Sequence, residues 1–161
     1  MPGASSNQPI SSPDFSLTLY QGAQELGAEE IEFSSIFSQG KPVVLNFWAG
    51  LCPPCRAEMP GFQRVYEELG DRFLLLGLDV GPFTGLGSRA DGQALLRELG
   101  ITYPAGTTFQ EGVMVDYKVR GMPTTVFLTA NGQVLDTHVG LLDEKTFRSK
   151  VENLLQEAGG S

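Results

Sequence analysis

The chain has 161 residues, of which 41% are hydrophobic, and these values fit a single domain with a sizeable core. Nineteen acidic against eleven basic residues leave a net charge of −8. This charge is opposite in sign to a surface that binds the phosphate backbone, so we expect no nucleic-acid partner.

The first 13 residues, MPGASSNQPISSP, are polar and rich in Pro, Ser and Gly. They lack the basic and then apolar pattern of a secretory signal peptide. The longest apolar runs further on fall well short of the roughly 18 residues of a membrane span. We therefore expect a flexible N-terminal tail over residues 1–13, one domain over 14–158 and a short C-terminal tail over 159–161.

The first half of the domain predicts strands and helices in alternation. DFSLTL, residues 14–19, predicts an edge strand, and IEFSSIF with the following QGKP predicts a short strand and a helical turn that ends at Gly40. VVLNFWA, residues 43–49, predicts a strand buried on both faces, and residues 54–69 predict an amphipathic helix.

The order of strand and helix is then repeated. FLLLGLDV, residues 73–80, predicts a second buried strand, and ADGQALLRELG, residues 90–100, predicts a second amphipathic helix. Two successive units of this kind indicate right-handed crossovers and a parallel core.

The C-terminal third predicts an antiparallel edge. After a loop and a short element at VMVDYKV, TTVFLTANGQVLDTHVG predicts two strands joined by a two-residue turn at Asn131-Gly132. DEKTFRSKVENLLQEAGG predicts a closing helix. Its inward-facing residues are Phe147, Val151, Leu154 and Leu155.

The only two cysteines, Cys52 and Cys55, stand at the predicted start of the helix after the strand 43–49. A structural zinc site requires four ligands, and the chain offers only these two and His138, so we expect no metal. A structural disulfide over so short a loop would contribute little stability. We favour a redox pair, because the positive end of a helix dipole lowers the pKa of a thiol.

Within this pair, we expect Cys52 to be the exposed attacking sulfur and Cys55, one turn further in, to resolve the mixed disulfide. Pro54 has no N–H to lose at the helix start and keeps the turn rigid. Further along, Pro123 in RGMPTTVFL directly precedes a predicted strand. At such a place a proline can follow a cis bond or be an ordinary trans residue.

The sequences WAGLCPPCRAEMP, VVLNF before it, and GMPTTVFL followed by NGQV resemble the thioredoxin-like proteins of the TlpA, ResA and CcmG type, which are bacterial extracytoplasmic thiol-disulfide oxidoreductases. The resemblance covers residues 14–158. It implies an α/β, thioredoxin-like fold with a central mixed β-sheet flanked by helices on both faces. It also implies that Met122-Pro123 is a cis bond beside the cysteines and that Met122 offers backbone groups to a bound polypeptide.

The same resemblance adds site residues. Glu58 matches an acidic residue that tunes proton transfer in several members. Its spacing of three from Cys55 lets its carboxyl face the cysteines, where partial burial would raise its pKa. The alternative is a surface glutamate that only favours the first turn of the helix through the dipole. Asn46 stands where cytoplasmic thioredoxins carry a buried Asp, and Leu51 replaces an aromatic residue of many relatives. The candidate catalytic residues are Cys52, Cys55, Glu58 and Pro123. The candidate substrate contacts are Trp48, Pro53, Pro54, Met122 and Thr124.

Two weaker signals are set aside. GLGSRA, residues 85–90, matches a dinucleotide fingerprint, but the acidic residue that the fingerprint requires further on is missing. We expect no cofactor and interpret this stretch as a connection that borders the active site. His138 is left without a role, because a lone histidine at a strand edge is typical of a structural position.

The function that we predict is thiol-disulfide oxidoreduction, in which the cysteine pair reduces protein disulfides outside the cytoplasm. The resemblance favours apocytochrome c as the substrate in cytochrome c maturation, with other extracytoplasmic proteins as the alternative. A membrane thiol electron donor, a monomeric state and a periplasmic or membrane-tethered location complete the expectation, with any leader or anchor absent from this chain.

Two other functions stay open. A peroxidase of the peroxiredoxin kind would carry P-x-x-x-[TS]-x-x-C, and here Leu45 and Ala49 occupy the Pro and Thr positions. A binding module would use the fold only to hold a partner, with the cysteines in a structural disulfide.

Overall fold

The computed structural model describes residues 11–160, so most of the predicted tail over residues 1–13 lies outside the described residues, as does Ser161. At the inner end of that tail, the Ser12 amide donates a hydrogen bond to the Gly132 carbonyl at 3.1 Å. Contacts with the domain therefore begin before residue 14.

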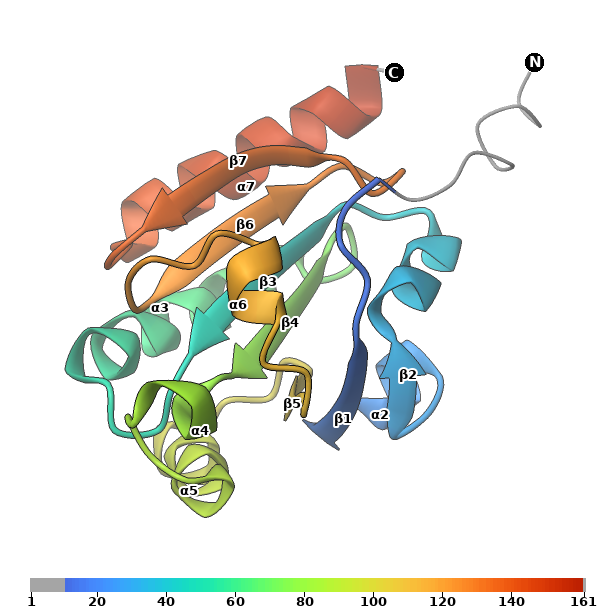
Figure 1. The fold of residues 1–161 in the computed structure, drawn as a ribbon. Helices are drawn as coiled ribbons and strands as arrows, with labels where there is room; N and C mark the ends of the chain where they lie inside the picture. Colours follow the sequence, from blue (N-terminus) through green and yellow to red (C-terminus); the bar gives the residue numbers. More distant parts are fainter. Residues whose placement is uncertain (1–10, 161) are drawn as a thin grey trace.

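A mixed β-sheet forms the centre of the described part (Figure 1). Its strands, in spatial order, are β2 (Glu30–Glu32), β1 (Ser16–Gln21), β5 (Ala105–Thr107), β4 (Leu74–Asp79), β3 (Val43–Trp48), β6 (Thr124–Leu128) and β7 (Val134–Val139). β3, β4 and β5 run parallel, whereas the pairs β3–β6 and β6–β7 are antiparallel. The predicted parallel core and antiparallel C-terminal edge are confirmed.

Two local predictions about the strands and their turns are wrong, and one strand was not predicted. β1 is not an edge strand, because it pairs with β2 on one side and with β5 on the other. β5 was not predicted, since its short sequence AGT has no apolar run and it forms where β1 and β4 both offer backbone partners. The turn between β6 and β7 has a three-residue loop, in which Gly132 has a φ of +84° and the Thr129 amide bonds the Gln133 carbonyl at 2.8 Å.

Helices cover both faces of the sheet (Figure 1). One core cluster contains residues from α3 (Pro53–Leu69), α5 (Arg89–Leu99) and α7 (Glu144–Gly160). The other contains residues from α2 (Ala23–Leu26), η1 (Phe33–Gln39) and α6 (Val113–Asp116). The inward face predicted for the closing helix is confirmed by the buried Phe147, Val151, Leu154 and Leu155. Within residues 11–160, none of the helices has the length and apolar character that crossing a membrane requires.

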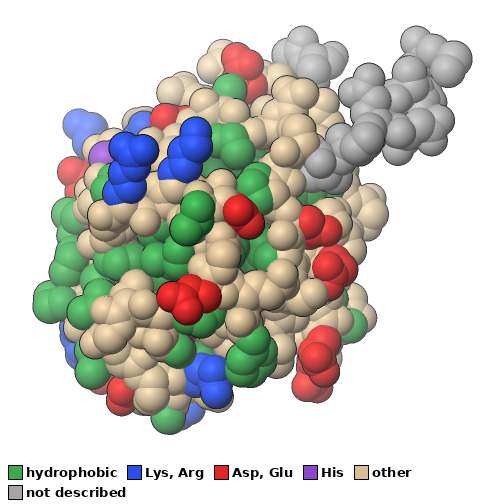
Figure 2. Space-filling view, viewed as in Figure 1, with side chains coloured by type: hydrophobic (Ala, Val, Ile, Leu, Met, Phe, Trp, Pro, Cys, Tyr) green, Lys and Arg blue, Asp and Glu red, His purple; other side chains and the backbone are tan. Residues whose placement is uncertain are grey.

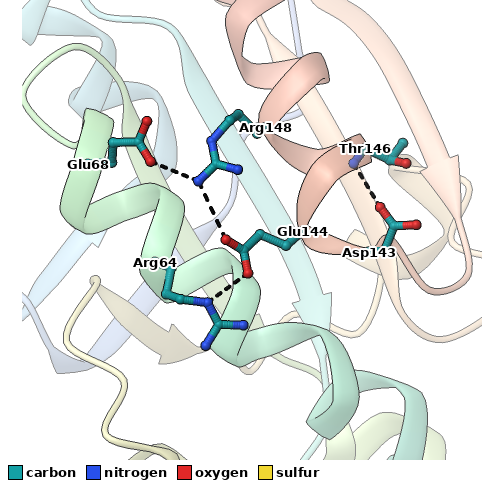
Figure 3. Close-up of polar contacts among 6 residues, drawn as sticks. All are labelled: Arg64, Glu68, Asp143, Glu144, Thr146 and Arg148. Carbon is teal, nitrogen blue, oxygen red and sulfur yellow. Dashed lines mark hydrogen bonds and ion pairs between the residues drawn. The ribbon is translucent and has the colours of Figure 1, made fainter.

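The helices α3 and α7 lie against each other at one close contact. A Cβ added to Gly61 would lie 2.9 Å from the Glu144 Cβ, so this position on α3 leaves no room for a larger side chain. Around it, Glu144 accepts from Arg64 at 2.7 Å and Arg148 donates to Glu68 at 2.8 Å (Figure 3). The contact fixes α3, the helix that begins at the cysteines, against α7.

Candidate active site

The cysteine pair lies at the N-terminus of α3, as predicted. Cys52 is the N-cap residue, with extended backbone angles, and Pro53 and Pro54 open the helix. Cys52 and Cys55 form a disulfide with their Cα atoms 5.3 Å apart. The Cys55 amide also donates to the Cys52 sulfur at 3.4 Å. A helix N-terminus therefore directs a backbone N–H at the sulfur of Cys52, which favours the thiolate once the disulfide is reduced.

Cys52 lies deeper than the sequence suggested, whereas the burial of Cys55 agrees with its predicted role as the inner, resolving cysteine. Cys55 is fully buried, and Cys52 keeps only 3% exposure, so the prediction of an exposed Cys52 is wrong for the disulfide form. The bond to Cys55 holds the Cys52 sulfur inward, against the core cluster that contains Trp48 and Ala49. The exposed group at this position is the neighbouring Leu51 side chain, which is 60% exposed.

The Met122–Pro123 peptide bond is cis, which confirms the prediction. Phe47 near the end of β3 is paired with Thr124 at the start of β6. This register places the segment with Pro123 beside the end of β3, from which the cysteine loop departs. The Thr124 hydroxyl donates to the Gly121 carbonyl at 2.7 Å and so ties the two sides of the proline turn together.

The candidate substrate contacts fall into two groups. Pro53 is exposed, and Pro54 and Met122 are half-buried, so these three reach the surface beside Cys52. Trp48 and Thr124 are fully buried, so in this structure they support the site from within and offer no contact area.

Apolar side chains surround the site. Figure 2 shows hydrophobic groups gathered at the left of the view, the side on which α3 and β6 begin in Figure 1. Val139 is 52% exposed, and one of its methyl groups lies 3.2 Å from the position that a Cβ on Gly121 would take. Leu51 and Val139 thus leave apolar surface close to the cysteine loop and to the proline turn.

The Glu58 carboxyl is buried, with 3% exposure, on the face of α3 that meets the sheet. Its two oxygens accept hydrogen bonds at 3.0 Å, one from Asn46 Nδ2 and one from the Leu142 amide. Asn46 Nδ2 also donates to the Thr125 hydroxyl at 3.1 Å. Burial raises the pKa of Glu58 to about 7, although the hydrogen bonds from Leu142 and Asn46 act in the opposite direction. The predicted burial and raised pKa are confirmed.

The stretch predicted to border the active site does so. The Leu51 amide donates to the Leu86 carbonyl at 2.7 Å. Sequence reasoning missed the short helix α4 (Gly81–Thr84) that precedes this stretch. It also missed the buried carboxyl of Asp79 and the bond between Glu58 and Asn46, because the apolar run around Asp79 and the spacing of Glu58 suggested no polar partner.

His138 and the possible metal ligands are the remaining candidates from the sequence. His138 Nε2 lies 3.2 Å from the Leu141 carbonyl oxygen, so this ring has a local structural contact. Among the described side chains, no three from His, Cys, Asp and Glu come together in a way that could hold a metal ion.

Known proteins share both the sequence and the fold. The AhpC/TSA family matches residues 11–137. Thioredoxin-like protein YneN of Bacillus subtilis is 33% identical over 142 residues, which cover 87% of this chain and 76% of YneN. Thiol-disulfide oxidoreductase ResA of Halalkalibacterium halodurans is 27% identical over 135 residues, covering 84% of this chain and 73% of ResA.

Solved structures agree with these matches. The exposed lipoprotein thioredoxin Etrx1 of Streptococcus pneumoniae has a TM-score of 0.70 and 25% identity, over 88% of this chain and 100% of Etrx1. The resemblance and the thioredoxin-like α/β fold predicted from the sequence are both confirmed.

Proposed function

This chain belongs to the AhpC/TSA family and is a thiol-disulfide oxidoreductase, and we propose that its Cys52–Cys55 pair reduces protein disulfides outside the cytoplasm. The observation that carries the proposal is the disulfide across the first turn of α3, beside a cis-proline turn and an apolar surface. Such a pair stores two electrons as a dithiol and passes them on by thiol–disulfide exchange.

In the reaction that we propose, the Cys52 thiolate attacks one sulfur of the substrate disulfide. A mixed disulfide forms and the other substrate sulfur leaves as a thiolate. Cys55 then loses its proton and attacks the Cys52 sulfur, which releases the second substrate thiolate and leaves the internal disulfide. The substrate disulfide gains two electrons and two protons, and the cysteine pair is oxidised.

The helix dipole and the Cys55 amide support Cys52 as the nucleophile, and the complete burial of Cys55 supports its role as the resolving thiol. Pro53, Pro54 and Met122 are the proposed contacts for the substrate chain. Pro123 is proposed to shape this contact, with Trp48 and Thr124 supporting it from within.

Glu58 is the proposed acceptor for the proton that Cys55 loses. A carboxyl with a pKa of about 7 can exchange a proton near neutral pH, and general-base catalysis of this kind contributes roughly 10²–10⁴-fold in rate. The raised pKa follows from desolvation of the carboxyl, so the role depends on the site staying closed to water.

The substrate that we propose is apocytochrome c, whose haem-binding cysteines would be kept reduced with electrons from a membrane thiol donor. General reduction of other extracytoplasmic proteins is the alternative. The name of the exposed lipoprotein thioredoxin Etrx1 supports an extracytoplasmic location, periplasmic or membrane-tethered. We expect the protein to act as a monomer.

Trapping tests the proposal. The Cys55→Ser variant, incubated with extracytoplasmic extract, should accumulate disulfide-linked partners through Cys52, and the Cys52→Ser variant should accumulate none. The wild-type protein should also reduce a disulfide-bonded test protein when a dithiol is supplied. A reduction potential below about −300 mV together with no trapped partner would instead indicate a structural disulfide in a binding module. Consumption of hydrogen peroxide that depends on Cys52, without reduction of the test protein, would indicate a peroxidase.

A further inference from the structure

Asp79, the last residue of β4, carries a carboxyl group that the proposed reaction does not use. The residue is fully buried. Its Oδ2 accepts a hydrogen bond from the Tyr20 hydroxyl at 2.9 Å, and its Oδ1 accepts one from the Gly81 amide at 2.9 Å. Burying an ionisable carboxyl costs free energy that its two hydrogen bonds offset only in part, so a role for the group at this position is worth seeking.

The carboxyl is enclosed by the elements around the cysteine loop. A Cβ added to Gly92 on α5 would overlap the Asp79 carboxyl, and it would lie 3.3 Å from Cη2 of Trp48. On the same helix, the backbone of Asp91 packs directly against Gly50, where a Cβ would lie 2.5 Å from the Asp91 carbonyl carbon. Asp79 therefore lies where β4, α5 and the residues before Cys52 meet.

A chain of hydrogen bonds leads from Asp79 to the cysteine loop. Asp79 accepts from the Gly81 amide, and the Gly81 carbonyl accepts from the Leu86 amide at 3.3 Å. The Leu86 carbonyl in turn accepts from the Leu51 amide at 2.7 Å. Leu51 directly precedes Cys52. The three bonds thus connect the Asp79 carboxyl, through the segment that contains Gly81 and Leu86, to the peptide that precedes Cys52.

We propose that Asp79 is a positioning residue for disulfide exchange. Through Gly81 and Leu86 it holds the Leu51 peptide, and it thereby fixes the direction in which Cys52 enters the N-terminus of α3. This inference rests on the proposed redox function of Cys52. If the segment were loose, Cys52 would spend less time aligned with the helix N–H groups that stabilise its thiolate.

Three ionisable groups face Asp79, and substitutions of Asp79 can distinguish the effect of its charge from the effect of its position. The groups are Tyr20 on β1 and Arg89 and Asp91 on α5. Burial raises the pKa of Asp79 to about 6, against the lowering effects of the bonds from Gly81 and Tyr20 and of Arg89. An amide at this position keeps an oxygen for the Gly81 N–H and removes the buried charge. Asp79→Asn should therefore keep the positioning, and Asp79→Ala should lose it.

The test measures amide hydrogen exchange and thiol reactivity in the full chain. In Asp79→Ala, exchange at the Leu51 and Leu86 amides should be about 10-fold faster than in wild type, because a hydrogen bond to a charged group is lost. The pH profile for alkylation of reduced Cys52 should move by about half a pH unit toward the ordinary thiol pKa. Asp79→Asn should stay within about twofold of wild type in both measurements.

Matched tyrosine variants serve if Asp79→Ala does not fold. Tyr20→Phe removes one of the two donors to Asp79 and should speed Leu51 exchange about threefold. Tyr117→Phe removes a hydroxyl that bonds the Pro13 carbonyl at 2.5 Å and should leave Leu51 unaffected.

Three results would overturn the inference. One is wild-type exchange at Leu51 in both Asp79→Ala and Tyr20→Phe. Another is faster exchange with an unchanged alkylation profile, which would make Asp79 a structural residue of the segment only. The third is that Tyr117→Phe speeds exchange at the Leu51 amide as much as Tyr20→Phe does. Failure of the proposed function would be distinguishable from these results. In that case the wild-type protein would not reduce the disulfide of the test protein, whatever the effect of the Asp79 variants on exchange at Leu51.

Discussion

Replacing Glu58 by Gln removes a buried charge and keeps the shape of the side chain. The difference between the ordinary pKa of 4.5 and the folded value of about 7 corresponds to roughly 3 kcal/mol of cost for burying the ionised form. Because the folded-state pKa is raised, the stability from this group is fully present below pH 4.5 and is lost as the pH rises through about 7. The neutral Gln variant does not lose it.

The hydrogen bonds around residue 58 determine how much stability the Gln variant loses in return. The Leu142 amide needs an acceptor, which the Gln oxygen supplies, so the Gln amide nitrogen must face Asn46. Among the described residues, no protein group bonds the buried Asn46 Oδ1, and a flipped Asn46 could therefore accept from the Gln. A less favourable geometry costs about 1 kcal/mol. Glu58→Gln should then be about 2 kcal/mol more stable than wild type at pH 8 and about 1 kcal/mol less stable at pH 4, where wild-type Glu58 is protonated in both states and only the cost in geometry remains.

Urea unfolding of the oxidised protein at pH 4, 6 and 8 measures this difference, with Glu67→Gln, an exposed position on the same helix, as the control. The control should differ from wild type by less than about 0.5 kcal/mol at each pH. A Glu58→Gln variant that is less stable than wild type at pH 8 would refute the reasoning about burial. A variant whose thiol titration curve and reductase rate match wild type across pH 5–9 would refute the proposed proton transfer and leave the burial argument intact.

Two further predictions concern the cysteines and the helix contact. In the reduced protein near neutral pH, iodoacetamide followed by mass spectrometry should show modification of Cys52 well before the fully buried Cys55, and the reverse order would exchange their roles. Gly61→Ala should lower stability by about 1 kcal/mol in urea unfolding, because the overlap with Glu144 outweighs the better helix propensity of Ala. Gly112→Ala, with open space around the new methyl group, is its control, and an equal effect of the two substitutions would exclude the overlap as the cause.

The elements predicted correctly are those whose signal is local. The run 43–49 and the helix after it carry a strong hydrophobic pattern, and the cysteines mark the start of that helix without any knowledge of the fold. β5 carries no such pattern, since AGT becomes a strand only because β1 and β4 lie on either side of it. The same limit explains why β1 was wrongly predicted to be an edge strand. Its outer edge is paired because β2 folds back onto it, and the sequence of β1 does not contain that information.

The site shows the same division between local and distant contacts. The motif places Glu58 one turn after Cys55, which was enough to predict its burial. The groups that hold its carboxyl are Asn46, on a strand, and Leu142, before the last helix, and no spacing in the sequence connects them. The exposure of Cys52 was overestimated for a related reason, because it depends on how the disulfide turns the sulfur inward.

Glu58 and Asp79 are two buried acids that the fold holds in a similar way. In each, one oxygen accepts a main-chain N–H and the other accepts a side-chain donor from a strand, Asn46 for Glu58 and Tyr20 for Asp79. An amide can replace either acid with little loss of shape, so the charge and the geometry can be tested apart. If Glu58 acts by its proton and Asp79 by its position, Gln at 58 should change the pH response of the thiols, and Asn at 79 should leave it unchanged.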